Sequence, residues 1–334
     1  MDLARTNTAA PPEQRAAVSV RGLEKRYGPI QAVRGIDLDV KPGEVFGFLG
    51  PNGAGKSTTI KMLCTLVTPT AGRAEVAGLD VITQRTKVRR QIGLVFQETT
   101  LDEYLTAEQN LKFHAAIYGM PRRTVGPRVD AVLDLVGLGD RKSSAVRTYS
   151  GGMKRRLEIA RGLLHSPRVL FLDEPTIGLD PDSRQVLWRY VDELRRREDI
   201  TVFLTTHYMD EAERCDRIAI INHGTIVALG TPAQLKAQVG DDRVRIVTAD
   251  NVESAKKLAS KLKIEAVPDG EALLVTVPDG EGFVPKLFGI GITVQSVSVS
   301  RPTLDDVFMA HAGHRIGEEE AAPAPRHWMR AMNR

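Results

Sequence analysis

GPNGAGKSTT, residues 50–59, follows the apolar run EVFGFL and precedes a segment with helical spacing. The stretch matches the pattern G-x-x-x-x-G-K-[ST], with Gly50, Gly55, Lys56 and Ser57 at its fixed positions. Glycines let successive backbone N–H groups point at one anion, and the helix that follows directs its positive end to the same place. A chance match in a chain this long is on the order of one per cent at average residue usage. The stretch therefore predicts a site for a nucleoside triphosphate.

The residues of this loop have separate expected roles. Lys56 reaches the outer phosphates, and Ser57 offers a hydroxyl to Mg²⁺. A nucleoside triphosphate together with its magnesium ion is therefore the expected ligand. The other loop residues expected to contact the nucleotide are Pro51, Asn52, Gly53, Ala54 and Thr58.

A second motif supplies the acidic groups that hydrolysis of a phosphate needs. The run VLFLDEP ends an apolar stretch with two adjacent carboxylates, Asp173 and Glu174. Asp173 is suited to hold Mg²⁺, either as a direct ligand or from the outer coordination shell of the ion. Glu174 is suited to polarise an attacking water. An acidic pair at the end of a strand can be a surface feature. Its occurrence in one chain with the glycine-rich loop favours the functional interpretation.

A third motif, YSGGMKRRLEIARG, places a serine and two glycines before a long helical pattern. Ser150, Gly151 and Gly152 thus form a second helix start that can bind phosphate. The nucleotide of this chain already has its loop at residues 50–57. A second phosphate-binding segment therefore indicates the nucleotide of a partner molecule.

Together these motifs resemble the nucleotide-binding subunit of ATP-binding cassette (ABC) transporters. YSGGM resembles the signature of that family, which is usually LSGGQ. Tyr149 and Met153 depart from the commonest form at the first and fifth positions. The three residues that would contact phosphate, Ser150, Gly151 and Gly152, are retained.

The remaining family elements occur in the expected order over roughly residues 17–239. Tyr27 matches the aromatic residue that stacks on adenine, and Gln97 matches the glutamine that senses Mg²⁺ and the attacking water. Asp180, in IGLDP, matches the loop that crosses between paired cassettes. His207 matches the switch histidine that contacts the γ-phosphate. Alone, His207 and Tyr27 would more often be ordinary packing residues, but the ordered series favours the functional assignment.

The resemblance implies ATP hydrolysis by a head-to-tail homodimer or pseudo-dimer of cassettes. Each of two ATP molecules, with Mg²⁺, would lie between the loop of one subunit and the signature of the other. Glu174 would position water, while Lys56 and His207 stabilise charge on the γ-phosphate. Closure of the pair would move the helices of a separate membrane permease, which is expected to dock on the helical block at 101–165 beside Gln97.

Composition and charge exclude other classes of protein. The formal net charge is +4 with both signs interspersed, so nucleic-acid binding is not expected. The sequence has no signal segment and no apolar run long enough to span a bilayer. Cys64 and Cys215 lie far apart, which fits a reducing compartment, and the HxxH pair of His311 and His314 lacks further ligands. We therefore expect a soluble subunit, peripheral at the cytoplasmic face of the cell membrane.

The expected fold is an α/β P-loop NTPase cassette with a mixed core sheet, an antiparallel β subdomain and a helical subdomain. Alternating runs at 17–23 and 32–40 favour antiparallel strands, and more continuous apolar runs favour buried parallel strands. The parallel strands are expected at 44–50, 92–97, 168–174 and 201–207. The expected domains are a disordered segment at 1–16, the cassette at 17–240, an accessory α+β domain at 241–313 and a disordered tail at 314–334.

The accessory domain refines the function. Its pattern predicts βαββαβ, a ferredoxin-like order, if a short strand forms at 263–267. A final helix at 301–313 would place Leu304, Val307 and Phe308 on one face. This arrangement resembles the C-terminal region of cassettes of the daunorubicin/doxorubicin-resistance type, which pair with a separate permease and export drugs or lipids. Some members of that type carry glutamine in place of His207, so the histidine implies active turnover.

Other classes remain as alternatives. A cassette ATPase of DNA repair would need a long coiled-coil insertion, and a translation-type cassette protein normally has two cassettes in one chain. The main alternative is an ABC importer whose C-terminal domain regulates it. At the end of the tail, Arg326, Arg330 and Arg334 recur every four residues around Trp328, which allows a short basic amphipathic turn at a membrane surface.

Overall fold

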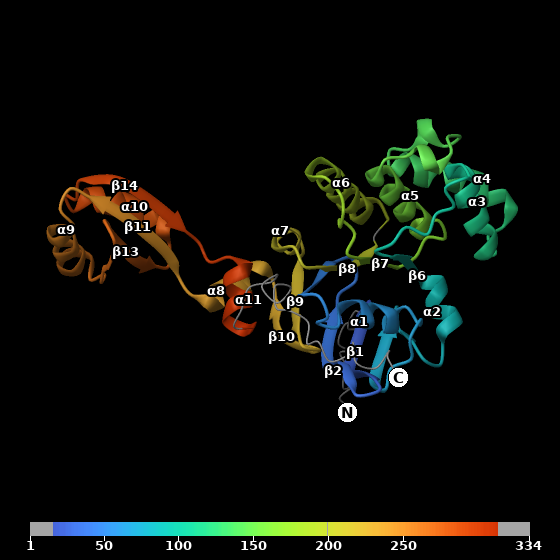
Figure 1. The fold of residues 1–334 in the computed structure, drawn as a ribbon, viewed down its shortest axis with the longest axis horizontal. Helices are drawn as coiled ribbons and strands as arrows, with labels where there is room; N and C mark the ends of the chain where they lie inside the picture. Colours follow the sequence, from blue (N-terminus) through green and yellow to red (C-terminus); the bar gives the residue numbers. More distant parts are fainter. Residues whose placement is uncertain (1–15, 199, 313–334) are drawn as a thin grey trace, which may run out of the picture. The chain divides into compact units, whose positions relative to one another are not determined.

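The computed structural model describes residues 16–198 and 200–312 (Figure 1). Contacts divide the chain into two compact units, with the division after Val227. The predicted tail at 314–334, with its basic turn, lies outside the described residues, as does the lead-in before residue 16. The predicted boundary near residue 240 lies later than this division and stays a prediction.

A six-stranded sheet forms the centre of the first unit. Its order is β10-β9-β3-β8-β7-β6, and β3 pairs in parallel with β8 and β9, as β7 does with β8 and β6. Every residue of β3, β7 and β8 is buried, which explains their continuous apolar sequences. The strands are β3 (Val45–Leu49), β6 (Ile92–Val95), β7 (Val169–Asp173), β8 (Thr201–Thr206), β9 (Arg217–Asn222) and β10 (Thr225–Gly230).

A second, antiparallel sheet shares the core of this unit. Its order is β2-β1-β4-β5, formed by β1 (Val18–Tyr27), β2 (Ile30–Val40), β4 (Ala71–Val76) and β5 (Leu79–Asp80). One hydrophobic cluster contains the inward residues of β1 and β2 together with aromatic residues of the parallel sheet. The rings of Phe46, Phe48 and Phe171 lie 5.4–5.7 Å from that of Phe203. The two sheets therefore fold as one body.

Helices complete the first unit, and three of them form the predicted helical block (Figure 1). α3, α4 and α5 pack on one another. Thr106 begins α3 with a capping box in which its side chain and that of Gln109 satisfy each other's backbone N–H. The helices are α1 (Lys56–Leu63), α2 (Arg85–Gln91), α3 (Ala107–Ile117), α4 (Arg122–Leu135), α5 (Gly151–Leu163), α6 (Pro181–Glu198) and α7 (Met209–Ala212).

The second unit contains an antiparallel sheet of order β12-β13-β11-β14, which is the ferredoxin-like order expected from the sequence. Helices α9 (Asn251–Lys257), followed by a π-turn at Leu258–Leu262, and α10 (Gly280–Gly289) form the crossovers. The short second strand forms, but not over the residues 263–267 considered from the sequence, of which it contains only Val267. Helical turns continue to Leu262 and Lys263 adopts a left-handed φ of 56°, and the strand begins only at Val267. The strands are β11 (Asp242–Thr248), β12 (Val267–Asp269), β13 (Ala272–Val277) and β14 (Val294–Ser300).

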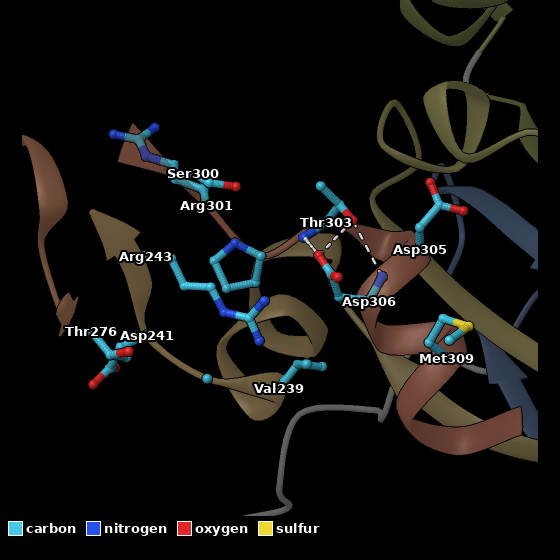
Figure 2. Close-up of a pocket in the computed structure, with 12 residues that line it drawn as sticks. Val239, Asp241, Arg243, Thr276, Ser300, Arg301, Thr303, Asp305, Asp306 and Met309 are labelled. Carbon is cyan, nitrogen blue, oxygen red and sulfur yellow. Dashed lines mark hydrogen bonds between the residues drawn. The ribbon is translucent and has the colours of Figure 1, made fainter. Parts of the chain in front are cut away.

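Two further helices of this unit pack on each other. α8 (Pro232–Val239) precedes the sheet and α11 (Leu304–Ala312) follows it. The apolar face expected at Leu304, Val307 and Phe308 is fully buried. Thr303 and Asp306 exchange hydrogen bonds at the start of α11 (Figure 2), which satisfies backbone groups that the helix itself leaves unpaired.

The described residues contain no helix that combines the length and the apolar character needed to cross a bilayer.

Close backbone packing between β6 and α5 yields the first prediction. A Cβ at Gly93 would lie 2.3 Å from the carbonyl oxygen of Gly162 and 2.9 Å from a methyl of Leu170. We expect Gly93→Ala to lower the free energy of unfolding by about 1–3 kcal/mol because backbone must shift. Gly289→Ala in α10 is the control, since a Cβ there has no neighbour within 4 Å. Urea unfolding followed by circular dichroism compares the two, and equal midpoints would contradict the prediction.

Candidate functional site

The glycine-rich loop connects β3 to α1 and lines a cavity of about 360 Å³. Gln97 and Glu174, predicted from two other motifs, line the same cavity. Both come from ends of strands that neighbour one another in the parallel sheet, and carboxyl ends of parallel strands share one edge. The full lining is Ala32, Pro51, Asn52, Gly53, Gly55, Lys56, Ser57, Thr58, Gln97, Glu174 and Ile177.

Steric constraints explain the glycines of the loop. A Cβ at Gly50 would lie 2.3 Å from the carbonyl oxygen of Ile221. Gly55 has φ 110°, and a Cβ there would lie 2.5 Å from the carbonyl oxygen of Ala32. Gly55 also caps α1 without a side-chain hydrogen bond, so the first N–H groups of the helix have no capping side chain. A helix start of this kind fits an anion.

Lys56 lies inside the loop and is only 4% exposed. Its Nζ donates hydrogen bonds to the carbonyl oxygens of Gly50, at 2.7 Å, and Pro51, at 3.0 Å. The same ammonium lies 3.1 Å from Glu174 Oε1. One buried charge of each sign thus lies at the cavity, and the carbonyl oxygens of the loop fix the position of the lysine ammonium.

The Glu174 carboxylate lies close to both Lys56 and His207. His207 Nδ1 lies 3.6 Å from its Oε1, on the side of the carboxylate that Lys56 also approaches. Burial raises the pKa of the Glu174 carboxyl, but His207 and the Lys56 ammonium outweigh burial and hold the pKa below its usual value. Glu174 is therefore ionised at neutral pH. An ionised carboxylate can accept a hydrogen bond from water and orient it.

Asp173, next to Glu174, is 5% exposed and lies against the start of α1. Its Oδ1 accepts hydrogen bonds from Ser57 Oγ at 3.2 Å and from Thr205 Oγ1 at 2.6 Å. A hydroxyl and a carboxylate are the hard oxygen ligands that Mg²⁺ prefers. Among the described residues no group of three or more His, Cys, Asp or Glu could hold a metal alone. The Ser57 hydroxyl and the Asp173 carboxylate fit Mg²⁺, an ion that proteins usually hold through one or two such groups together with phosphates and waters.

Several predicted residues do not line this cavity. Tyr27 ends β1, is 44% exposed and has Lys25 Nζ 4.9 Å from its ring centre. Ser150 caps α5, and its Oγ accepts a hydrogen bond from the backbone N–H of Met153 at 3.3 Å. Asp180 accepts two hydrogen bonds from Ser183, which lower the pKa of its carboxyl. Gly151 and Gly152 begin α5, so the signature is a helix start separate from the loop.

Three buried residues at the site were not found by sequence analysis. The Thr205 hydroxyl contacts Asp173, and Glu211 accepts hydrogen bonds from the hydroxyls of Thr176 and Thr206. Arg155, on the signature helix, donates to the carbonyl oxygens of Asp173 and Glu174. The sequence gives one indication of these residues, which is that they lie close to the motifs. Threonine is common in strands and arginine in helices, so neither residue type points to a site by itself.

A larger cavity, of about 730 Å³, lies in the second unit between the sheet and the start of α11 (Figure 2). Its lining mixes Arg243 and Arg301 with Asp241 and Asp305, and none of the residues predicted for nucleotide binding lines it. The start of α11 is already capped by Thr303 and Asp306. Size alone therefore does not make this cavity a triphosphate site.

Comparison with known proteins assigns the family. Residues 33–177 match the family model described as ABC transporter. Residues 230–312 match the one described as ATP-binding protein DrrA1-3-like, C-terminal domain. The chain is 42% identical over 313 residues to the daunorubicin resistance ATP-binding protein DrrA3 of Streptomyces coeruleorubidus, covering 92% of this chain and 99% of that relative. The chain belongs to the ABC transporter ATP-binding proteins.

Further relatives of this ABC protein agree. The linearmycin resistance ATP-binding protein LnrL of Bacillus subtilis is 37% identical, covering 90% of this chain and 99% of LnrL. Among solved structures, cbiO1 from Clostridium perfringens has a TM-score of 0.63 at 28% identity, covering 75% of this chain and 96% of cbiO1. A dimeric structure of the ATP-binding cassette MJ0796 bound to ADP and Pi has a TM-score of 0.58 at 27% identity, covering 64% and 98%.

The family and fold expected from the sequence are thereby confirmed. This ABC protein is an ATP-binding and ATP-hydrolysing subunit with a P-loop NTPase cassette and a DrrA-type C-terminal domain. The residue assignments within the site rest on the geometry above and stay predictions.

The position of Lys56 gives a direct test of nucleotide binding. We expect Lys56→Ala to remove saturable ATP binding, because a methyl cannot balance the charge of the phosphates. Lys61→Ala is the matched control, since Lys61 is an exposed lysine of the same helix. Titration with a fluorescent ATP analogue measures both variants, with circular dichroism as a check of folding. Unchanged affinity in Lys56→Ala would contradict the assignment.

Proposed function

We propose that this ABC subunit powers the export of drugs, antibiotics or lipids through a separately encoded permease. The observation that carries the proposal is the match over almost the whole chain, C-terminal domain included, to proteins named for resistance to daunorubicin and linearmycin. An importer with a regulatory C-terminal domain is the alternative, and the two relatives named for drug resistance favour export over it.

The chemistry that we propose for the site follows from its charges. Glu174 is ionised and positions the attacking water, while His207 stabilises charge on the γ-phosphate. Lys56 lies beside Glu174 and can instead pair with the outer phosphates when they enter the cavity. Ser57, Asp173 and Gln97 would hold Mg²⁺, which when bound neutralises charge on the phosphate oxygens.

A head-to-tail dimer of cassettes would complete the site. The signature residues Ser150, Gly151 and Gly152 form a helix start outside the cavity of their own chain. Asp180 lies on the loop between Glu174 and α6 and is exposed. A second copy can therefore offer both segments to the ATP held by the first. Tyr27, exposed at the end of β1, is proposed to stack on adenine.

The helical block offers a surface for the permease. Phe113 and Ile117, four residues apart on α3, are 59% and 62% exposed, and Tyr104 is 86% exposed. A cavity of about 440 Å³ is lined by residues that follow α3 and α5 in the sequence, among them Tyr118 and His165. Exposed apolar side chains that lie close together on a surface are typical of a protein interface. Through it the subunit would bind peripherally at the cytoplasmic face of the cell membrane.

The dimer model predicts the behaviour of two variants. We expect Glu174→Gln to keep ATP binding but to slow hydrolysis by about a hundredfold or more, because the group that positions the nucleophile is lost. With ATP, Glu174→Gln should elute as a dimer in size-exclusion chromatography. Adding Ser150→Arg should return it to a monomer, whereas Ser143→Arg, at another exposed serine, should not. A dimer in the Ser150→Arg double variant would refute the shared site.

The docking surface predicts membrane association. In cells that carry the permease, Phe113→Asp and Ile117→Asp should move the subunit from the membrane fraction to the supernatant, because a charge is introduced into an apolar contact. Val252→Asp, at an apolar residue of α9 that is 68% exposed, should stay on the membrane. Both docking variants should lower resistance to daunorubicin or linearmycin as much as Lys56→Ala does. Normal resistance in all three would remove these drugs as cargo.

A further inference from the structure

The backbone at Glu174 has an unfavourable conformation. Its φ is 48°, in the left-handed region that residues with a Cβ seldom adopt. A conformation of this kind persists only where surrounding contacts hold it. Lys56 and His207 contact the Glu174 carboxylate, but neither contact fixes the backbone of the turn formed by Asp173, Glu174 and Pro175. Other groups must therefore hold that backbone in its left-handed conformation.

One hydroxyl contacts both acidic residues of this turn. Thr205 lies on β8, directly opposite Asp173 of β7 in the parallel register, and is completely buried. Its Oγ1 donates a hydrogen bond to Asp173 Oδ1 at 2.6 Å and accepts one from the backbone N–H of Glu174 at 2.9 Å. The hydroxyl thus fixes the carboxylate of one residue and the backbone of the next.

One guanidinium holds the other side of the turn. Arg155, on α5, is 7% exposed and donates to the carbonyl oxygens of Asp173 at 3.1 Å, Glu174 at 3.2 Å and Pro175 at 2.7 Å. Its charge is balanced by Glu158 one turn along the helix, at 3.1 Å. Three consecutive carbonyl groups are therefore held by one planar group, which lysine could not do with the same geometry.

From these contacts we propose that Thr205 and Arg155 are positioning residues for ATP hydrolysis. They hold the left-handed turn that directs the Glu174 carboxylate into the nucleotide cavity and orients Asp173 toward Ser57. Neither residue lines that cavity, so both act through Asp173 and Glu174. The inference rests on the roles proposed above for these two carboxylates.

Replacing the hydroxyl alone gives the sharpest test. Thr205→Val keeps the shape of the side chain and removes both hydrogen bonds. We expect kcat to fall by about ten- to a hundredfold, the range produced by a displacement of about 1 Å at a reacting group. ATP affinity measured without Mg²⁺ should stay within about twofold, because the phosphate loop is unchanged. Hydrogen exchange of the peptide that contains the Glu174 amide should become faster, a readout that does not depend on activity.

Thr205→Ser is the matched control, because it keeps the hydroxyl and loses only the methyl. We expect it to retain kcat and slow amide exchange close to those of the unmodified chain. A wild-type kcat in Thr205→Val would overturn the proposal, as would equal impairment of the serine and valine variants. If Thr205→Val does not fold, Arg155→Lys decides. A reduced kcat with ATP affinity retained supports the proposal, and a wild-type kcat overturns it.

Glu174→Gln, assayed alongside, separates this inference from the proposed function. A wild-type rate in Glu174→Gln would overturn the role of Glu174 and the positioning proposal together. A slow Glu174→Gln with a fast Thr205→Val would overturn only the positioning role.

Discussion

The in-register pairing of three parallel strands is the constraint on which the site depends. β3 leads into the phosphate loop, β7 ends in Asp173 and β8 leads to His207. Leu49 lies opposite Thr206, and Asp173 lies opposite Thr205, so three segments far apart in sequence end at one edge. A slip of one residue would turn the buried side chains to the opposite face and separate these groups. The phenylalanine cluster around Phe203 stabilises this register from within the core.

Charge balance is the second requirement at this edge. Lys56, Asp173, Glu174 and Arg155 are each at least nine-tenths buried, and a buried charge without a partner is costly. Each one has a partner: the lysine has Glu174 and loop carbonyls, Asp173 has two hydroxyls, and the arginine has Glu158 and backbone carbonyls. These partners keep the four side chains in the protein interior, where electrostatic interactions are stronger than in water. A polyanion that enters the cavity therefore meets groups whose charges are already oriented.

Much of this structure could be predicted from the sequence, because the backbone conformation and burial at particular positions allow few residue types. Glycine at positions 50 and 55 is the only residue whose backbone fits, and the buried strands have continuous apolar sequences. β4 and β5 were not predicted, because AGRAEV carries two charges and has mostly exposed side chains. The left-handed turns at Glu174 and Lys263 have no sequence signal, since neither residue is glycine. Thr205 and Arg155 were missed because their partners lie on distant segments, which a single sequence does not connect.

The packing of α11 on α8 has a consequence for how the C-terminal unit is organised. The ferredoxin-like sheet begins directly after α8 and ends directly before α11, so topologically it is an insert between two helices that contact each other. Both ends of the sheet therefore connect to the same pair of packed helices, α8 and α11. A chain that stops after α8 loses α11, the helix on which α8 packs. Residues 241–302 can accordingly be exchanged as one segment in protein engineering, since α8 and α11 can still pack on each other when the sheet between them is replaced.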